Sequence, residues 1–216
     1  RIIDLSYKHG LSHIGSCLTA LPILDHIYKT KGLGDAVVLS CGHAGLALYV
    51  VLEKYEGRDA EQLLEKHGIH PCRDVENGIF VSTGSLGQGI AVAVGFALAG
   101  RTVHCVISDG ECAEGSVWEA LAFIHKMNLK NINIHVNVNG FSAYDALGKW
   151  YLWWRLKAFW WPVKVWFTKS PYFEGLAAHY KTLKEEDIEK INAQGLCQVA
   201  PRSYASRLAD IFACLL

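Results

Sequence analysis

Residues 102–140, TVHCVISDGECAEGSVWEALAFIHKMNLKNINIHVNVNG, decide the fold of this chain. Two short apolar runs, Thr102–Ile107 and Ile132–Val138, have the length and the β-branched content of buried strands. Between them, Glu114–Met127 repeats its apolar residues at helical spacing. A strand, a helix and a strand in succession predict a βαβ unit with two parallel strands.

The same alternation continues on both sides of this unit. Ala36–Ser40 reads as an earlier buried strand, and Val163–Thr168 reads as a fourth strand. The sequence therefore predicts an α/β fold in which helices flank a parallel sheet. The other expected helices are Leu18–Lys31 with Pro22 near its start, Ala44–Tyr55, Glu56–His67, Ile90–Gly100, Leu183–Ala193 and Tyr204–Leu215.

Composition excludes several classes of protein. The 216 residues are 51% hydrophobic and 19% charged, with 21 basic and 21 acidic side chains, so no basic excess favours nucleic acid or an anionic membrane. The longest apolar stretch, near Leu86–Gly100, is shorter than a membrane span. Seven scattered cysteines without a C-x-x-C pair argue against a disulfide framework and a zinc ribbon. We expect a soluble cytoplasmic protein with no recognisable leader.

Polar or glycine-containing corners follow three of the expected strands: Ser40–His43, Asp109-Gly110 and Asn139-Gly140. Ligands of open parallel sheets bind beyond the carboxyl ends of the strands, where these corners meet. Carboxylate and amide oxygens, completed by substrate phosphates, are the ligands that Mg²⁺ prefers. Asp-Gly and Asn-Gly are also ordinary turn dipeptides, but their placement at two neighbouring strand ends favours a metal and phosphate site.

Five motifs in order, from about Ser12 to Ser142, resemble those of transketolase. Asp109-Gly110-Glu111 and the following EGSVWEA resemble the family's thiamine diphosphate motif, which ends here at Asn139. The other four are SHIG around His13, LSCGHA around His43, His70-Pro71, and the turn TGSLGQG, residues 83–89.

The resemblance implies a role for each matching residue. It implies three metal ligands, which are the side chains of Asp109 and Asn139 and the backbone carbonyl of Phe141. The metal would be Mg²⁺, with Ca²⁺ or Mn²⁺ as substitutes. Contacts to thiamine diphosphate would come from His43, Gly84, Leu86, Asp109, Gly110, Asn139 and, from a late segment, His179. The catalytic residues would be His13, His43 and His70, which line the reacting centre, and Glu114, which links paired active sites.

The implied function is transfer of a two-carbon ketol unit from a ketose phosphate to an aldose phosphate, as in the pentose phosphate pathway. Nothing in the chain matches the family's pyrimidine-binding domain, so the chain is expected to be either a fragment or, as we favour, the N-terminal subunit of a split transketolase. Its partner would be a C-terminal subunit carrying that domain, in a hetero-tetramer or with self-association. The alternatives are a subunit of another thiamine diphosphate enzyme, similar to 1-deoxyxylulose-phosphate synthase or a dehydrogenase, and a non-catalytic cofactor-binding subunit.

Within its length the chain departs from the family pattern at two places, Ser108 and the Trp-rich segment after Gly140. Ser108 replaces the usual glycine before Asp109, and a shortened segment follows Gly140. Six of the seven tryptophans lie in Trp150–Trp166, which is expected to be either an aromatic core or a protein interface. The last residues match no known segment. We therefore assign residues 1–191 to the diphosphate- and metal-binding domain and residues 192–216 to a tail of unknown role.

Overall fold

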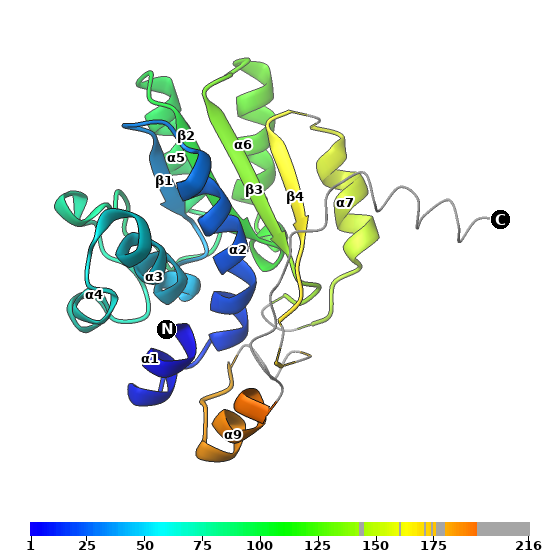
Figure 1. Cartoon of the computed structure of the whole chain (residues 1–216). Helices are drawn as coiled ribbons and strands as arrows, with labels where there is room; N and C mark the ends of the chain where they lie inside the picture. Colours follow the sequence, from blue (N-terminus) through cyan, green and yellow to red (C-terminus); the bar gives the residue numbers. More distant parts are fainter. Residues whose placement is uncertain (143–144, 160, 171, 174, 176–179, 194–216) are drawn as a thin grey trace.

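The computed structural model describes residues 1–142, 145–159, 161–170, 172–173, 175 and 180–193 (Figure 1). The expected helix Tyr204–Leu215 and the candidate ligand His179 lie outside the described residues.

A parallel sheet of four strands forms the centre of the fold (Figure 1). The strands lie in chain order, and each pairs in parallel with the next. Ser108 pairs with Asn137, so the second and third strands end level with one another. All four predicted strands are confirmed within a residue or two: β1 Ala36–Leu39, β2 Val103–Ser108, β3 Ile132–Val138 and β4 Val163–Phe167.

Helices cover both faces of the sheet (Figure 1). On one side of the sheet lie α2 Ile14–Thr30 and α3 Gly45–Glu56, with α1 Ile2–Lys8 and α4 Ala60–His67 packed on these two helices. The other face packs against α5 Gly89–Leu98, α6 Gly115–Lys126 and α7 Lys149–Lys157. Short 3₁₀ turns η1 Gly42–Ala44, η2 Val75–Asn77 and η3 Gly110–Ala113 lie in the loops, and α9 Glu185–Ala193 follows β4.

Two helix predictions were wrong in their boundaries. The helix expected from Leu18 begins at Ile14, so Pro22 lies well inside it, where packing of α2 on the sheet and α3 outweighs the lost hydrogen bond. Residues 56–67 do not form one helix. Gly57 ends α3 in the left-handed conformation (φ 68°), and the Asp59 carboxylate caps α4.

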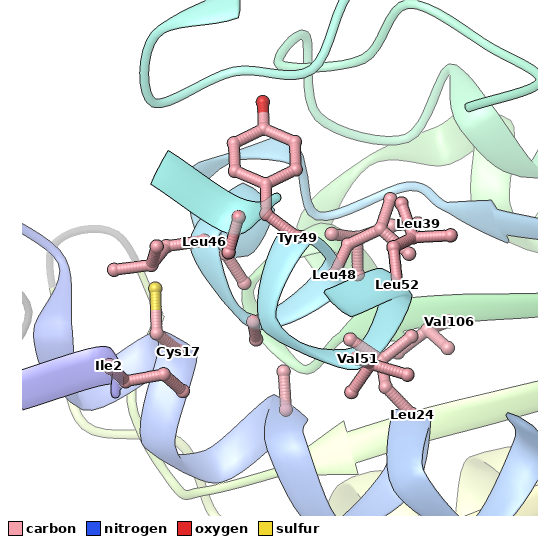
Figure 2. Close-up of a cluster of buried hydrophobic side chains, with 14 of the residues drawn as sticks. Ile2, Cys17, Leu24, Leu39, Leu46, Leu48, Tyr49, Val51, Leu52 and Val106 are labelled. Atoms are coloured by element: carbon pink, nitrogen blue, oxygen red, sulfur yellow. The ribbon is translucent and has the colours of Figure 1, made fainter. Parts of the chain in front are cut away.

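Alternating strand residues build two hydrophobic cores. Val37, Leu39 and Val106 face the α1–α4 layer, while Val38 and Cys105 face the α5–α7 layer. Figure 2 shows the first core, where side chains of α1, α2 and α3 gather against those of β1 and β2. The two cores bury the strand residues on both faces of the sheet.

The face of β3 toward α2 is polar, and its His135 is hydrogen-bonded on both sides. Trp166 Nε1 donates to His135 Nδ1 (3.2 Å), which leaves the neutral imidazole proton on His135 Nε2, 3.4 Å from His104 Nδ1. His104 Nε2 then faces Asp35 at 3.4 Å. Burial holds the pKa of His135 well below its usual value. These two histidines match no motif, and the structure places them in the sheet rather than at its carboxyl edge.

Helix α7 was not predicted and carries the Trp-rich segment. Leu152 and Leu156 are buried against the sheet, whereas Trp150, Tyr151 and Trp154 are 55%, 66% and 68% exposed. The segment therefore contributes both to the core and to an exposed aromatic surface. Among the described residues, no helix is long and apolar enough to cross a membrane.

Candidate functional site

The carboxyl edge of the sheet brings the polar corners of three strands together. Asp109 N donates to the carbonyl of Asn137 (2.9 Å), which keeps the ends of β2 and β3 side by side. Ser40 follows β1 and reaches the same region through its hydroxyl, which donates to the Glu111 carboxylate (2.6 Å). Since all the strands are parallel, residues separated by about a hundred positions meet at one edge.

Asp109 is a buried carboxylate at the centre of this edge. Its side chain accepts from the N–H of Gly140 (2.6 Å) and from that of Gly110 (3.1 Å), and the residue is 1% exposed. Burial raises its pKa to about 6, although these backbone donors stabilise the charged form. Gly110 opens η3, so this aspartate is held by the loops that follow both β2 and β3.

Asn139 lies on the neighbouring strand end and shapes the loop beside Asp109. Its Oδ1 accepts from the N–H of Phe141 (3.0 Å), forming a local turn. Gly140, between them, has a φ of 94°, which glycine adopts without strain. The structure therefore brings together Asp109, Asn139 and Phe141, the three residues predicted as metal ligands.

The donor set fits a divalent cation. Asp109 has no cationic side chain within ion-pair distance in the described part of the chain, so its buried charge is held by N–H groups alone. A buried carboxylate without a counter-charge is costly, and a bound cation would remove that cost. The loops after β2 and β3 together offer carboxylate, amide and carbonyl oxygens, which are the ligands that the hard cation Mg²⁺ prefers.

Glu111 organises the edge, although the sequence suggested no role for it beyond its motif. Its fully buried carboxylate accepts from Ser40 Oγ and from the N–H groups of Gly87 (3.0 Å) and Ser108 (2.9 Å). It thereby ties the loop after β1, the glycine turn and the end of β2 into one unit. Burial raises its pKa. Its position in the Asp-Gly-Glu motif was the only sequence signal.

Two glycines allow the site loops to touch. A Cβ on Gly42 would lie 2.6 Å from the Gly84 nitrogen, and a Cβ on Gly84 would lie 3.0 Å from the ring of His70. Both distances are shorter than van der Waals contact. The η1 turn that carries His43 is therefore packed directly on the predicted cofactor-binding turn.

The three predicted catalytic histidines converge. The His13 and His43 rings are 5.4 Å apart, and burial, followed by the electrostatic effect of the neighbouring His70, lowers the pKa of His13. His13 immediately precedes α2 and has the left-handed conformation (φ 64°), which is uncommon for a residue with a Cβ. Backbone strain of this kind is concentrated at functional sites.

The remaining predicted residues fall at the rim of the site. Glu114 is exposed at the start of α6, and a Cβ on Gly87 would lie 2.8 Å from its Cβ. Leu86 is half-buried in the turn before Gly87.

Two further side chains lie beside the site without any motif to mark them. The ring of Tyr180 is 5.4 Å from that of His13, and the side chain of Lys149 lies over Gly140. Both come from the segment after Gly140, beyond the five matched motifs.

Comparison with known proteins gives one consistent family. Residues 25–151, more than half of the chain, match the family described as transketolase, thiamine diphosphate binding domain. Transketolase from Mus musculus is 35% identical over 165 residues, which cover 66% of this chain and 26% of that protein. One of the named subunits of apulose-4-phosphate transketolase, from Phocaeicola vulgatus, is 33% identical over 156 residues, covering 61% of this chain and 54% of that relative.

Solved structures support the fold. A mutant transketolase from Pichia stipitis superimposes with a TM-score of 0.72 at 20% identity, over 89% of this chain and 39% of that one. The predicted α/β class with a parallel sheet flanked by helices is therefore confirmed. The chain spans about a quarter of the length of the whole transketolases that it matches.

Proposed function

Because this chain belongs to the transketolase family through its thiamine diphosphate-binding domain, we propose that it forms the diphosphate-holding part of an enzyme that transfers two-carbon ketol units. The donor would be a ketose phosphate and the acceptor an aldose phosphate. The observation that carries this proposal is the meeting of Asp109 and Asn139 at one sheet edge, together with the three-histidine cluster. Glu111 ties the loops of the two together through its hydrogen bonds with Ser40, Gly87 and Ser108. A domain that held only phosphate would have no need of that cluster.

The proposed metal ligands would hold the cofactor in place. Asp109, Asn139 and the Phe141 carbonyl would hold Mg²⁺, which orients a diphosphate and offsets its charge. When bound, thiamine diphosphate supplies the chemistry that breaks and forms carbon–carbon bonds. Glu111 keeps the loops around it at fixed spacing through its three accepted hydrogen bonds.

The histidines would move protons at the substrate hydroxyls. Since the pKa of His13 is lowered, this imidazole is neutral near pH 7 and can accept a proton. His43 and His70 lie next to it and would bind or protonate the neighbouring oxygens.

Activity would require a partner that carries the pyrimidine-binding domain. This part of the proposal is supported by the likeness to a relative that is itself named a transketolase subunit. We propose that the chain is one subunit of such a complex.

The test is to purify the chain from its source, identify any stoichiometric partner by mass spectrometry, and assay ketol transfer. We expect activity only with thiamine diphosphate, a divalent metal and the partner, and loss of activity in EDTA. A preparation with partner and cofactor but no ketol transfer would contradict the proposal and favour a non-catalytic binding subunit.

A further inference from the structure

Lys149 stands over the loop that carries the candidate metal ligands. The chain leaves β3 at Asn139 and turns back: Phe141 pairs with Ala146, and Leu147 N donates to the Gly140 carbonyl (2.8 Å). This return places Lys149, the first residue of α7, above Gly140. A Cβ on Gly140 would lie 2.2 Å from Lys149 Cε and 3.2 Å from its Nζ. In this position the lysine side chain fills the space that a Cβ on residue 140 would occupy.

The ammonium group is thereby close to the centre of the site. Gly140 lies between Asn139 and Phe141, and its N–H donates to Asp109. The structure shows no hydrogen bond or ion pair of Lys149 with any described residue. The Lys149 ammonium thus has no acidic partner among the described residues. Its positive charge would attract an anionic ligand to this loop.

The other cations of α7 are held elsewhere. The guanidinium of Arg155 lies 3.9 Å from the centre of the Trp118 ring, and Lys157 Nζ lies 5.5 Å from that of Trp153. Both are engaged by aromatic faces. Lys149 alone among the basic residues of this helix is directed over Gly140.

Mg²⁺ offsets only part of the negative charge that a diphosphate and Asp109 would bring together. We propose that Lys149 supplies further positive charge, and that its ammonium binds the diphosphate of thiamine diphosphate. This assignment rests on the proposed function and adds to it a cofactor-binding residue from the segment after the family motifs. A charge-assisted hydrogen bond from an ammonium to a phosphate oxygen is among the stronger polar interactions in proteins.

The experiment is calorimetric titration of the protein, with its co-purified partner where one is present, in Mg²⁺. The probes are thiamine diphosphate, inorganic pyrophosphate and thiamine, and the variants are K149M, K149R and the matched control K157M on the same helix. We expect K149M to weaken binding of both diphosphate probes by roughly tenfold to a hundredfold and to leave thiamine binding unchanged. K149R, which keeps the charge, should stay within about threefold of the wild type.

The outcomes distinguish a failure of the Lys149 assignment from a failure of the proposed function. Equal affinities of the wild type and K149M for pyrophosphate would overturn the assignment of Lys149 while leaving the proposed function in place. An equal loss in K157M would also overturn it, because the effect would then come from the general charge of α7. A wild type that binds neither diphosphate probe in Mg²⁺ would overturn the proposed function itself. Should K149M fail to fold, K149R against K149Q gives the same comparison.

Discussion

Replacing Gly42 by alanine tests whether the site loops are packed as closely as the structure shows. The new Cβ would lie 2.6 Å from the Gly84 nitrogen, 2.6 Å from the Thr83 carbonyl carbon and 2.8 Å from the Thr83 oxygen. Favourable contacts between such atoms are about 3.5–4.0 Å long. All three atoms belong to backbone, so the Thr83–Gly84 loop must move as a whole. Overpacking of this kind costs about 1–3 kcal/mol.

Gly95→Ala is the matched control, because it is the same chemical change with the opposite expected sign. Gly95 lies inside α5, where an added Cβ would meet no atom within 4 Å. Neither Gly95 nor Gly42 has a positive φ. Alanine in a helix interior is about 0.5–1 kcal/mol more favourable than glycine. The two variants should therefore differ by about 1.5–4 kcal/mol in free energy of unfolding.

Urea denaturation followed by circular dichroism measures both free energies, and unchanged m-values show that the compared states are the same. In thermal unfolding, each kcal/mol corresponds to roughly 2–4 °C for a chain of this size. Gly42→Ala should also weaken cofactor binding, since Gly84 must shift. The reasoning fails if Gly42→Ala unfolds within 0.5 kcal/mol of the wild type, because the loops would then separate freely.

Three further predictions concern the site and the sheet. Asp109→Ala should abolish Mg²⁺-dependent cofactor binding and activity without changing the circular dichroism spectrum; surviving activity would remove the metal assignment. His13→Gly should be about 1 kcal/mol more stable than His13→Ala in urea, because only the alanine keeps a Cβ at a φ of 64°; equal stabilities would refute the strain. His135, whose pKa is depressed, stays neutral in the fold while the unfolded chain binds a proton below pH 6.5. Stability is therefore lost as the pH falls, by about 1.4 kcal/mol at pH 5.5. Parallel stability–pH curves for the wild type and His135→Leu would contradict this prediction.

The four strands and the meeting of Asp109 with Asn139 could be predicted because their signals are local. Short β-branched runs marked all four strands, and Asp109 and Asn139 came directly after two of them. Parallel pairing then required that the two strand ends meet. Helix boundaries were less accurate, as at Ile14, because packing on the sheet extends α2 beyond its periodic pattern.

The sequence by itself determined the α/β fold, the edge of the sheet where the candidate site lies and the motif residues that meet there. The tertiary structure alone decided which segments touch: Glu111 with Ser40 and Gly87, and Lys149 with Gly140. Periodicity reports how a residue is placed relative to its neighbours in the chain. It carries no trace of a contact between distant segments, because such a contact depends on how the loops return once the strands have paired.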